Sequence, residues 1–241
     1  GKSHFGWHMI SVANAYDLFP PEVIKWRTKI WKIRDAKYYI PDFTNNNFGW
    51  NGYLAPNDKT NGTQPDMYEY VACQATAWDC PVSLHPKLSQ LKAHPRTPDN
   101  LEVMRRWEEA RLSGFFSDSQ KTAIRNNPDQ EYILLTDEKE RFELQPYKQI
   151  QDVANGNTHV QAFIFKRQEK SYVVYWHTSG EGKIFLKLGA EKVRLYEQLG
   201  KELQVTPADN GLIVPVGSRL YLETDLSTEK LAAAFKNAEV L

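Results

Sequence analysis

The chain has 241 residues, and its 30 Lys and Arg balance 30 Asp and Glu, so the formal net charge is zero. Nucleic-acid binders normally concentrate positive charge, because phosphate neutralisation supplies most of their affinity. The balance therefore predicts no nucleic-acid partner. No apolar run approaches the ~18 residues needed to span a bilayer, which predicts a soluble chain.

Strands and helices alternate in the front half. The pattern predicts a strand over residues 4–12, a helix from the Pro20-Pro21 pair to about residue 34, and a strand over residues 37–43. We expect this helix to bury the apolar stripe formed by Val23, Trp26, Ile30 and Ile33, with its basic residues in solvent.

A polar segment, TNNNFGWNGYLAPNDKTNGTQ, follows without a regular pattern, and loops of such length are usually functional or disordered. Beyond it we expect a helix from Pro65, a strand over residues 80–84 and a helix that Thr97-Pro98 opens and Gly114 stops. A capping box from Ser117 to Gln120 predicts one more short helix. This alternation is typical of a parallel α/β fold.

The period changes after Pro128, where short alternating runs with hairpin-length connections indicate an antiparallel sandwich or barrel. A last helix follows Ser227. We expect an α/β domain over residues 1–128 and an antiparallel β-sandwich with a C-terminal helix over residues 129–241. The expected strands are residues 132–135, 160–166, 172–177, 184–188, 193–196, 211–214 and 219–222.

Three βα units cannot close a (β/α)8 barrel, which needs eight units and about 250 residues. The front half is therefore expected to be a small open α/β layer or the last portion of a larger barrel. In the second case the sandwich, a second copy of the chain or a missing N-terminal region has to cover the surface left by further units.

The sequence predicts neither a metal site nor a bound cofactor. Cys73 and Cys80 are expected ~10 Å apart along a helix, beyond the ~7 Å of a disulfide, and two thiols alone do not hold zinc. His4 and His8 would lie ~13 Å apart on a strand. No dinucleotide fingerprint, Walker loop, H-E-x-x-H or G-x-S-x-G occurs, so nicotinamide, phosphoryl-transfer and serine-hydrolase chemistry lack support.

Asp42 ends the second expected strand, immediately before the long polar segment. Ligands of parallel α/β folds bind beyond the carboxyl ends of the strands, so Asp42 has the position of a catalytic carboxylate. Alternatively, it only organises the turn after Pro41 through its own backbone.

Amides and rings crowd the same segment, with Asn45, Asn47 and Trp50 among them. Carbohydrate sites stack flat rings on sugar faces and bond the hydroxyls with amides, which these residue types provide. The alternative is an ordinary turn-rich loop, because Asn and Gly form turns in their own right. Three further side chains are expected to face the same mouth, although His8 also fits a core histidine: Trp7, His8 and His85.

Glycosidase catalysis needs two carboxyl groups about 5 to 10 Å apart. Asp42 supplies one candidate. Asp66 and Glu69 open a helix, where the dipole favours ionised carboxylates and plain helix capping explains them. The chain offers no convincing second member of a pair.

Residues 67–111 resemble the end of the barrel domain in bacterial glycoside-hydrolase-like proteins. In those proteins a helix bearing Trp-Asp, here Trp78-Asp79, leads into the last strand, here CPVSL. A long helix with the pattern seen here as Arg106-Trp107-Glu108 and Arg111 follows, and then an accessory β-sandwich. The strand pattern of the back half resembles that sandwich.

The resemblance implies the last three βα units of a glycosidase barrel with its sandwich, in a secreted bacterial protein of the periplasm or the extracellular space. It implies a carbohydrate ligand, hydrolysis by carboxylate acid/base chemistry with Asp42 as acid or base, and no cofactor. About five barrel units have no counterpart, and such families carry at least one catalytic carboxylate on an earlier strand. The alternative is a non-catalytic glycan-binding or structural module that keeps the fold.

Overall fold

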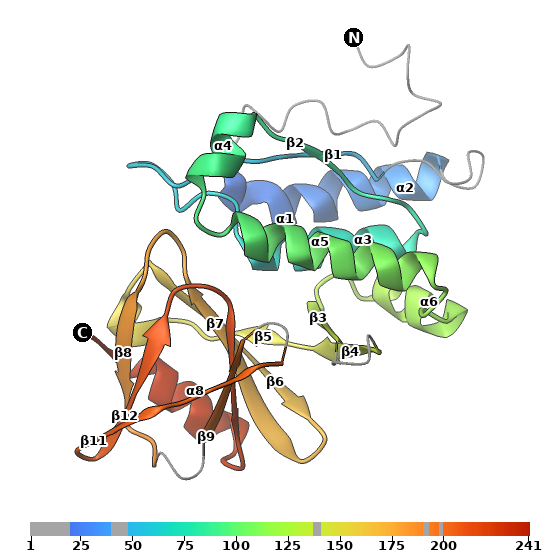
Figure 1. Cartoon of the computed structure of the whole chain (residues 1–241). Helices are drawn as coiled ribbons and strands as arrows, with labels where there is room; N and C mark the ends of the chain where they lie inside the picture. Colours follow the sequence, from blue (N-terminus) through green and yellow to red (C-terminus); the bar gives the residue numbers. More distant parts are fainter. Residues whose placement is uncertain (1–19, 40–47, 137–140, 190–192, 198–199) are drawn as a thin grey trace. The chain divides into compact units, whose positions relative to one another are not determined.

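The computed structural model describes residues 20–39, 48–136, 141–189, 193–197 and 200–241. The chain divides into two compact units, the first ending at Leu134 and the second running from Leu135 to Leu241. Helices and sheets both occur, so the expected mixed α/β architecture is confirmed (Figure 1). No helix of the described residues is long and apolar enough to cross a bilayer.

A continuous helix opens the described part of the first unit. It begins as the 3-10 turn η2 (Pro21–Val23), continues as α1 (Ile24–Arg27), widens into the π-helical segment η3 (Thr28–Lys32) and ends as α2 (Ile33–Tyr39). Proline suits the first turn because no intrahelical partner exists there for an N–H group. The strand expected over residues 37–43 is wrong for residues 37–39, which continue the helix; residues 40–43 lie outside the described residues. The strand propensity of single residues is weak, so the helix that precedes these residues decides their conformation.

The π-helical segment changes which face of this helix is buried. Thr28 and Lys32 are buried, whereas Trp26 and Ile30 of the expected apolar stripe are 56% and 43% exposed. The expected stripe is therefore wrong at Trp26 and Ile30. Ile30 lies inside the π-helical segment, where hydrogen bonds from residue i to i+5 shift the buried face relative to a period of 3.6 residues. Trp26 precedes that segment, and the buried residues on either side of it are Ile24 and Arg27.

Two parallel strands and one helix form a βαβ unit. β1 (Trp50–Gly52) pairs with β2 (Ser83–His85), and α3 (Pro65–Ala77) connects them. β1 lies inside the segment expected to be irregular. Within the described residues no third strand joins this sheet, so of the three expected βα units only this arrangement is observed there, and no barrel is formed.

The helix α3 is buried along its whole length. It packs against α1, α5 (Thr97–Leu112) and α6 (Asp118–Asn126), and α5 runs beside it in Figure 1. The short helix α4 (Leu88–Ala93) lies between β2 and α5 in the chain.

The capping box at Ser117 and the end of α5 before Gly114 are confirmed. Cys73 and Cys80 are confirmed as free, buried thiols.

Glu69, in the middle of α3, is fully buried. Its carboxylate accepts the indole N–H of Trp107 at 2.5 Å and the backbone N–H of Leu134 at 3.3 Å, and the guanidinium of Arg106 lies 3.9 Å away. Arg106 also donates to the Leu134 carbonyl at 2.9 Å. A buried charge is tolerated only with such partners, so this network allows a carboxylate inside the helix layer.

The second unit consists mainly of antiparallel strands. Each of the seven runs expected to be strands overlaps an observed strand, although residues 187–188 and 219 lie outside β8 and β13, and β4, β5, β10, β11 and β14 are additional. The bounds are β3 (Tyr132–Thr136), β4 (Phe142–Pro146), β5 (Lys148–Gln149), β6 (Val160–Arg167), β7 (Lys170–His177), β8 (Gly182–Leu186), β9 (Val193–Glu197), β10 (Glu202–Leu203), β11 (Thr206–Ala208), β12 (Gly211–Val216), β13 (Leu220–Thr224) and β14 (Glu239–Val240). In the described residues one sheet has the order β10-β9-β13-β7-β6-β5, a second has the order β11-β12-β8-β14, and β3 pairs with β4.

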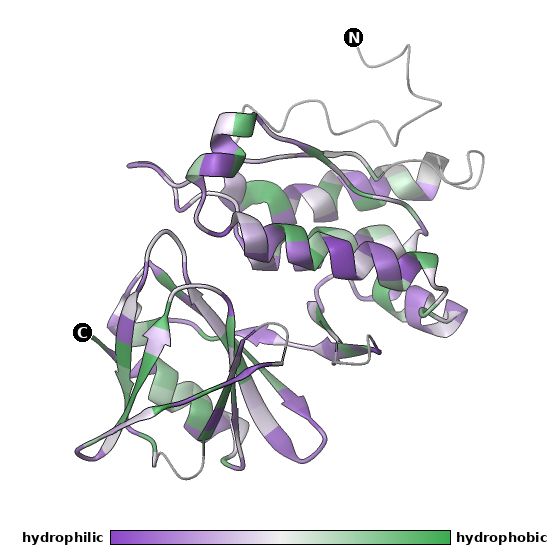
Figure 2. Cartoon of the chain, viewed as in Figure 1, coloured by the Kyte–Doolittle hydropathy of each residue, from purple (hydrophilic) through white to green (hydrophobic). Residues whose placement is uncertain are grey.

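One hydrophobic cluster draws on both larger sheets and on α8 (Thr228–Lys236). Alternate residues of β7, Val173 and Tyr175, belong to it, as the period of two along a strand requires. The Phe235 ring of α8 lies 5.1 Å from the Tyr175 ring, and Figure 2 shows α8 coloured mainly as hydrophobic. Ser227 caps α8 as expected. The short segment α7 (Val153–Gly156) also lies in this unit and is a turn in which Ala154 and Asn155 have positive φ. The arrangement of the two sheets as a sandwich and the boundary at Pro128 stay predictions.

Replacing Glu69 by Ala is expected to lower the free energy of unfolding by about 3 to 5 kcal/mol, because it leaves two buried N–H donors without their acceptor and removes one of the two carboxylates beside the buried Arg106 guanidinium, the other being Glu102 at 3.5 Å. The control is Glu109→Ala, which removes an exposed partner of Arg105 on α5 and is expected to cost less than about 1 kcal/mol. Urea unfolding of both variants measures the difference. Equal losses would show that the Glu69 network does not stabilise the helix layer.

Candidate functional site

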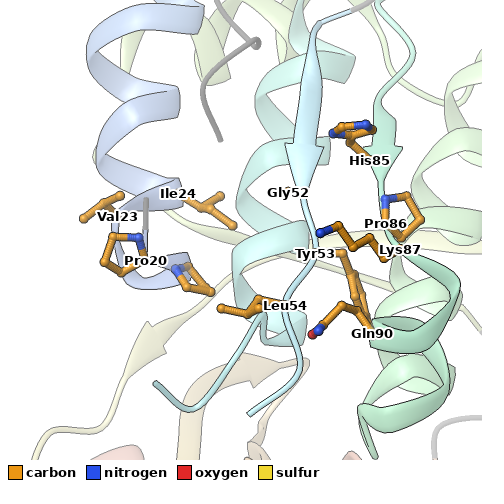
Figure 3. Close-up of a pocket in the computed structure, with 11 residues that line it drawn as sticks. Pro20, Val23, Ile24, Gly52, Tyr53, Leu54, His85, Pro86, Lys87 and Gln90 are labelled. Atoms are coloured by element: carbon orange, nitrogen blue, oxygen red, sulfur yellow. The ribbon is translucent and has the colours of Figure 1, made fainter. Parts of the chain in front are cut away.

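A hollow of about 200 Å³ opens where β1 and β2 end, and we call it the strand-end hollow (Figure 3). Three segments line it: the start of the first helix, the residues that follow β1, and the residues that follow β2. The ends of two adjacent parallel strands thus meet at one cavity, which is where ligands bind in open α/β sheets. The lining residues are Pro20, Pro21, Val23, Ile24, Gly52, Tyr53, Leu54, His85, Pro86, Lys87 and Gln90.

A buried polar contact fixes the two strands beneath the strand-end hollow. Asn51 of β1 is fully buried, and its amide nitrogen donates to the Ser83 carbonyl of β2 at 3.2 Å. Its amide oxygen accepts from the Lys32 amine at 2.5 Å. Burial first, and the charge of Arg27 second, lower the pKa of Lys32 well below the usual value for lysine. Asn51 therefore links the first helix to both strands.

The loop after β1 is folded back on itself. The backbone N–H of Thr63 donates to the Leu54 carbonyl at 2.9 Å, and the Leu54 N–H donates to the Thr63 hydroxyl at 3.0 Å. Gly62 makes this closure possible, because its φ is +74° and a Cβ there would lie 2.6 Å from the Leu54 carbonyl oxygen. The loop thereby holds Leu54 in the wall of the hollow.

A second set of hydrogen bonds fixes Tyr53. Its hydroxyl lies 2.5 Å from the Thr97 hydroxyl and accepts from the Asn100 amide at 3.2 Å. His94 donates from Nε2 to the Thr63 carbonyl at 2.8 Å and accepts the Arg96 N–H at Nδ1. Burial lowers the pKa of His94 to about 4, so the imidazole is neutral near pH 7. These bonds hold Tyr53 in its place in the lining of the hollow.

Two polar side chains of the lining keep hydrogen-bond donors unused. Gln90 accepts the Ala55 N–H at 2.7 Å through its amide oxygen, which leaves its amide nitrogen without a partner among the described residues. The exposed Lys87 amine has no hydrogen bond or ion pair within the same part of the chain. Figure 3 shows the Lys87 side chain extending from the end of β2 toward Gly52 and Tyr53. The lining is therefore rich in donors.

The residues nominated from the sequence fall into two groups. Five of them lie outside the described residues, namely Trp7, His8, Asp42, Asn45 and Asn47. Trp50 is the first residue of β1 and pairs with Ser83, and its side chain is not among the described ones. His85 ends β2 and lines the strand-end hollow. Its role toward a substrate stays a prediction.

Sequence reasoning missed Tyr53, Lys87 and Gln90. Lys87 and Gln90 lie two and five residues after His85. Ligands bind beyond the carboxyl ends of parallel strands, so the residues that follow His85 were also candidates. Tyr53 was missed because β1 was not recognised as a strand.

A second depression, between α3 and α5, is less suited to a ligand. Its polar lining residues are already paired, Arg105 with Glu102 and Glu109, and Glu108 with Arg111. In the described ranges no group of three His, Cys, Asp or Glu side chains lies close enough to hold a metal ion. The strand-end hollow is the better candidate.

No protein-family model and no curated protein matches the sequence. Among solved structures, a family 39 glycoside hydrolase from Bacteroides cellulosilyticus WH2 is 12% identical at a TM-score of 0.29, over 80% of this chain and 38% of that one. A Thermotoga maritima α-fucosidase is 12% identical at a TM-score of 0.25, over 78% and 41%. An α-amylase from Geobacillus thermoleovorans is 9% identical at a TM-score of 0.29, over 85% and 47%.

This chain spans less than half the length of these three proteins. All three are glycoside hydrolases by name or by enzyme class. Their TM-scores of 0.25 to 0.29 establish neither a shared fold nor a shared activity. The geometry of the strand-end hollow therefore has to carry any functional argument.

Gly62→Ala is expected to destabilise the first unit by more than about 3 kcal/mol, because positive φ strain is joined by a clash with the Leu54 backbone. The matched control is Gly114→Ala, where φ is +70° but nothing lies within 4 Å of the added Cβ. That variant should lose only the conformational cost of about 1 to 2 kcal/mol. Thermal unfolding of both variants separates the cost of the positive φ from the cost of the clash. Similar losses of stability in the two variants would contradict the close approach at Gly62.

Proposed function

We propose that this chain is a carbohydrate-active protein of the glycoside-hydrolase-like class, which binds an oligosaccharide at the strand-end hollow. The observation that carries the proposal is the position of the hollow at the carboxyl ends of two neighbouring parallel strands, with rings and amide donors in its wall. Sugar rings present both C–H faces and hydroxyl groups, so they need this combination of partners.

The lining matches both needs. Apolar surface comes from the rings of Pro20, Pro21 and Pro86 and from the side chains of Ile24 and Leu54. Polar partners are His85, Lys87 and the free amide nitrogen of Gln90. Small-molecule sites have this character, a mainly apolar wall with a few polar groups that set orientation.

The size of the strand-end hollow limits what enters it. About 200 Å³ is below the ~300–1,000 Å³ of typical small-molecule pockets, so a single sugar ring is a better fit than a longer chain. We infer that one terminal or branching sugar unit occupies the hollow while the rest of the oligosaccharide stays outside it.

Hydrolysis would require carboxylate acid/base chemistry, for which Asp42 is the proposed acid or base, with Trp7, His8, Asn45, Asn47 and Trp50 as further contacts. A second candidate function is favoured by one observation: the eleven described lining residues include no Asp or Glu. A non-catalytic glycan-binding module needs no carboxylate pair, whereas a glycosidase needs two.

The wider architecture belongs to the same proposal. Parallel sheets are normally buried on both faces and contain more than two strands, so the β1–β2 pair favours a larger α/β layer to which other residues contribute. We propose that this layer is the end of a glycosidase-like barrel, completed by a further region or a second copy, and that the second unit is its accessory β-sandwich. A protein of this class would act in the periplasm or outside the cell.

His85→Ala is expected to weaken oligosaccharide binding at least tenfold, about 1.4 kcal/mol, because it removes a polar group from the hollow. His159→Ala, an exposed histidine of the second unit, is the control and should bind as the wild type does. A glycan array selects the ligands, and titration calorimetry measures both variants.

Sugar release from the selected ligands then separates the two functions. Release that Asp42→Asn abolishes while binding persists supports hydrolysis. Binding without release supports the module. No binding to any glycan would overturn the proposed function.

A further inference from the structure

We propose that the strand-end hollow selects a sugar that carries a negatively charged group, a carboxylate or a sulfate ester, and that Lys87 is the residue that recognises this charge. This inference rests on the proposed function, because it names the class of sugar that the same site takes. The observation behind it is the imbalance of donors and acceptors in the lining.

The charged and amide groups of the lining are donors without matching acceptors. The Lys87 ammonium donates only, and it has no partner in the described part of the chain. Gln90 uses its amide oxygen on the Ala55 N–H, so its remaining capacity is the two N–H groups of the amide nitrogen. No carboxylate of the described lining balances the lysine.

Lys87 and Gln90 are joined through the backbone at the start of α4, because the Gln90 N–H donates to the Lys87 carbonyl at 2.9 Å. Lys87 is the extended N-cap residue of α4, and its side chain extends toward Gly52 and Tyr53 in Figure 3. Two acceptors near the hollow are already engaged: the Gly52 carbonyl accepts from the Tyr68 hydroxyl at 3.2 Å, and the Tyr53 hydroxyl is bonded to Thr97.

A ligand that completes this site has to bring acceptors, and at least one of them should be charged. A neutral sugar offers hydroxyl groups that both donate and accept, so it would leave the ammonium without an ionic partner. A carboxylate or sulfate accepts from the Lys87 ammonium as an ionic partner, and such charge-assisted hydrogen bonds are roughly twice as strong as neutral ones.

The test compares matched pairs of sugars on the intact chain by titration calorimetry. The probes are short oligosaccharides ending in glucuronate or galacturonate, their glucose or galactose counterparts, their sulfated forms, and inorganic sulfate alone. The variant is Lys87→Met, which keeps most of the aliphatic stem. The control is Lys92→Met, an exposed lysine of α4, the helix that Lys87 precedes, and Lys92 does not line the hollow.

We expect the acidic sugars to bind at least tenfold more tightly than the neutral ones, and Lys87→Met to reduce them to the neutral level while Lys92→Met changes nothing. Comparison of the uronate with the sulfated arm identifies which anion is preferred.

Equal binding of acidic and neutral sugars would overturn this inference and leave the proposed function unaffected. Inorganic sulfate that binds as tightly as the acidic sugars would overturn the sugar specificity. If no sugar binds, the proposed function itself is lost.

Discussion

The first unit depends on one buried polar contact, in which Asn51 joins three segments of the chain. Its amide donates to the Ser83 carbonyl and accepts from the Lys32 amine, so one residue of β1 is bonded both to β2 and to the first helix. A buried amide that lost these partners would cost about 1 to 3 kcal/mol. Because β1 has only three residues, its ladder with β2 offers few hydrogen bonds beside this contact.

The strand-end hollow follows from that constraint. Once β1 and β2 are in register, Gly52 and His85 lie opposite each other, and the chain leaves both strands at the same edge. The closed loop around Gly62 and the Tyr53 hydrogen bonds then determine which side chains form the wall. The groups that position the wall are thus buried polar groups that also stabilise the fold.

The positions of the seven expected strands in the second unit could be predicted from the sequence, whereas β1 of the first unit could not. Alternation with a period of two is direct evidence for a strand, and Val173 and Tyr175 follow it into the core. In the first unit, Asn51 and Gly52 are poor strand formers, and β1 exists because of tertiary contacts that no local pattern records. The sequence pattern also predicts Lys32 in solvent, whereas the π-helical segment turns it toward Asn51. Of the candidate site, the sequence located the edge of the sheet through His85 but not Tyr53, Lys87 or Gln90.

Amide hydrogen exchange tests the Asn51 contact most directly. The Phe48 N–H donates to the Pro81 carbonyl at 2.8 Å and the Ser83 N–H to the Gly49 carbonyl at 3.3 Å, so both amides should be protected in the wild type. Asn51→Ala should remove that protection, while the amides of β7 in the second unit stay protected. Rapid exchange of both amides in the wild type, or protection that Asn51→Ala leaves unchanged, would contradict the central role of this contact.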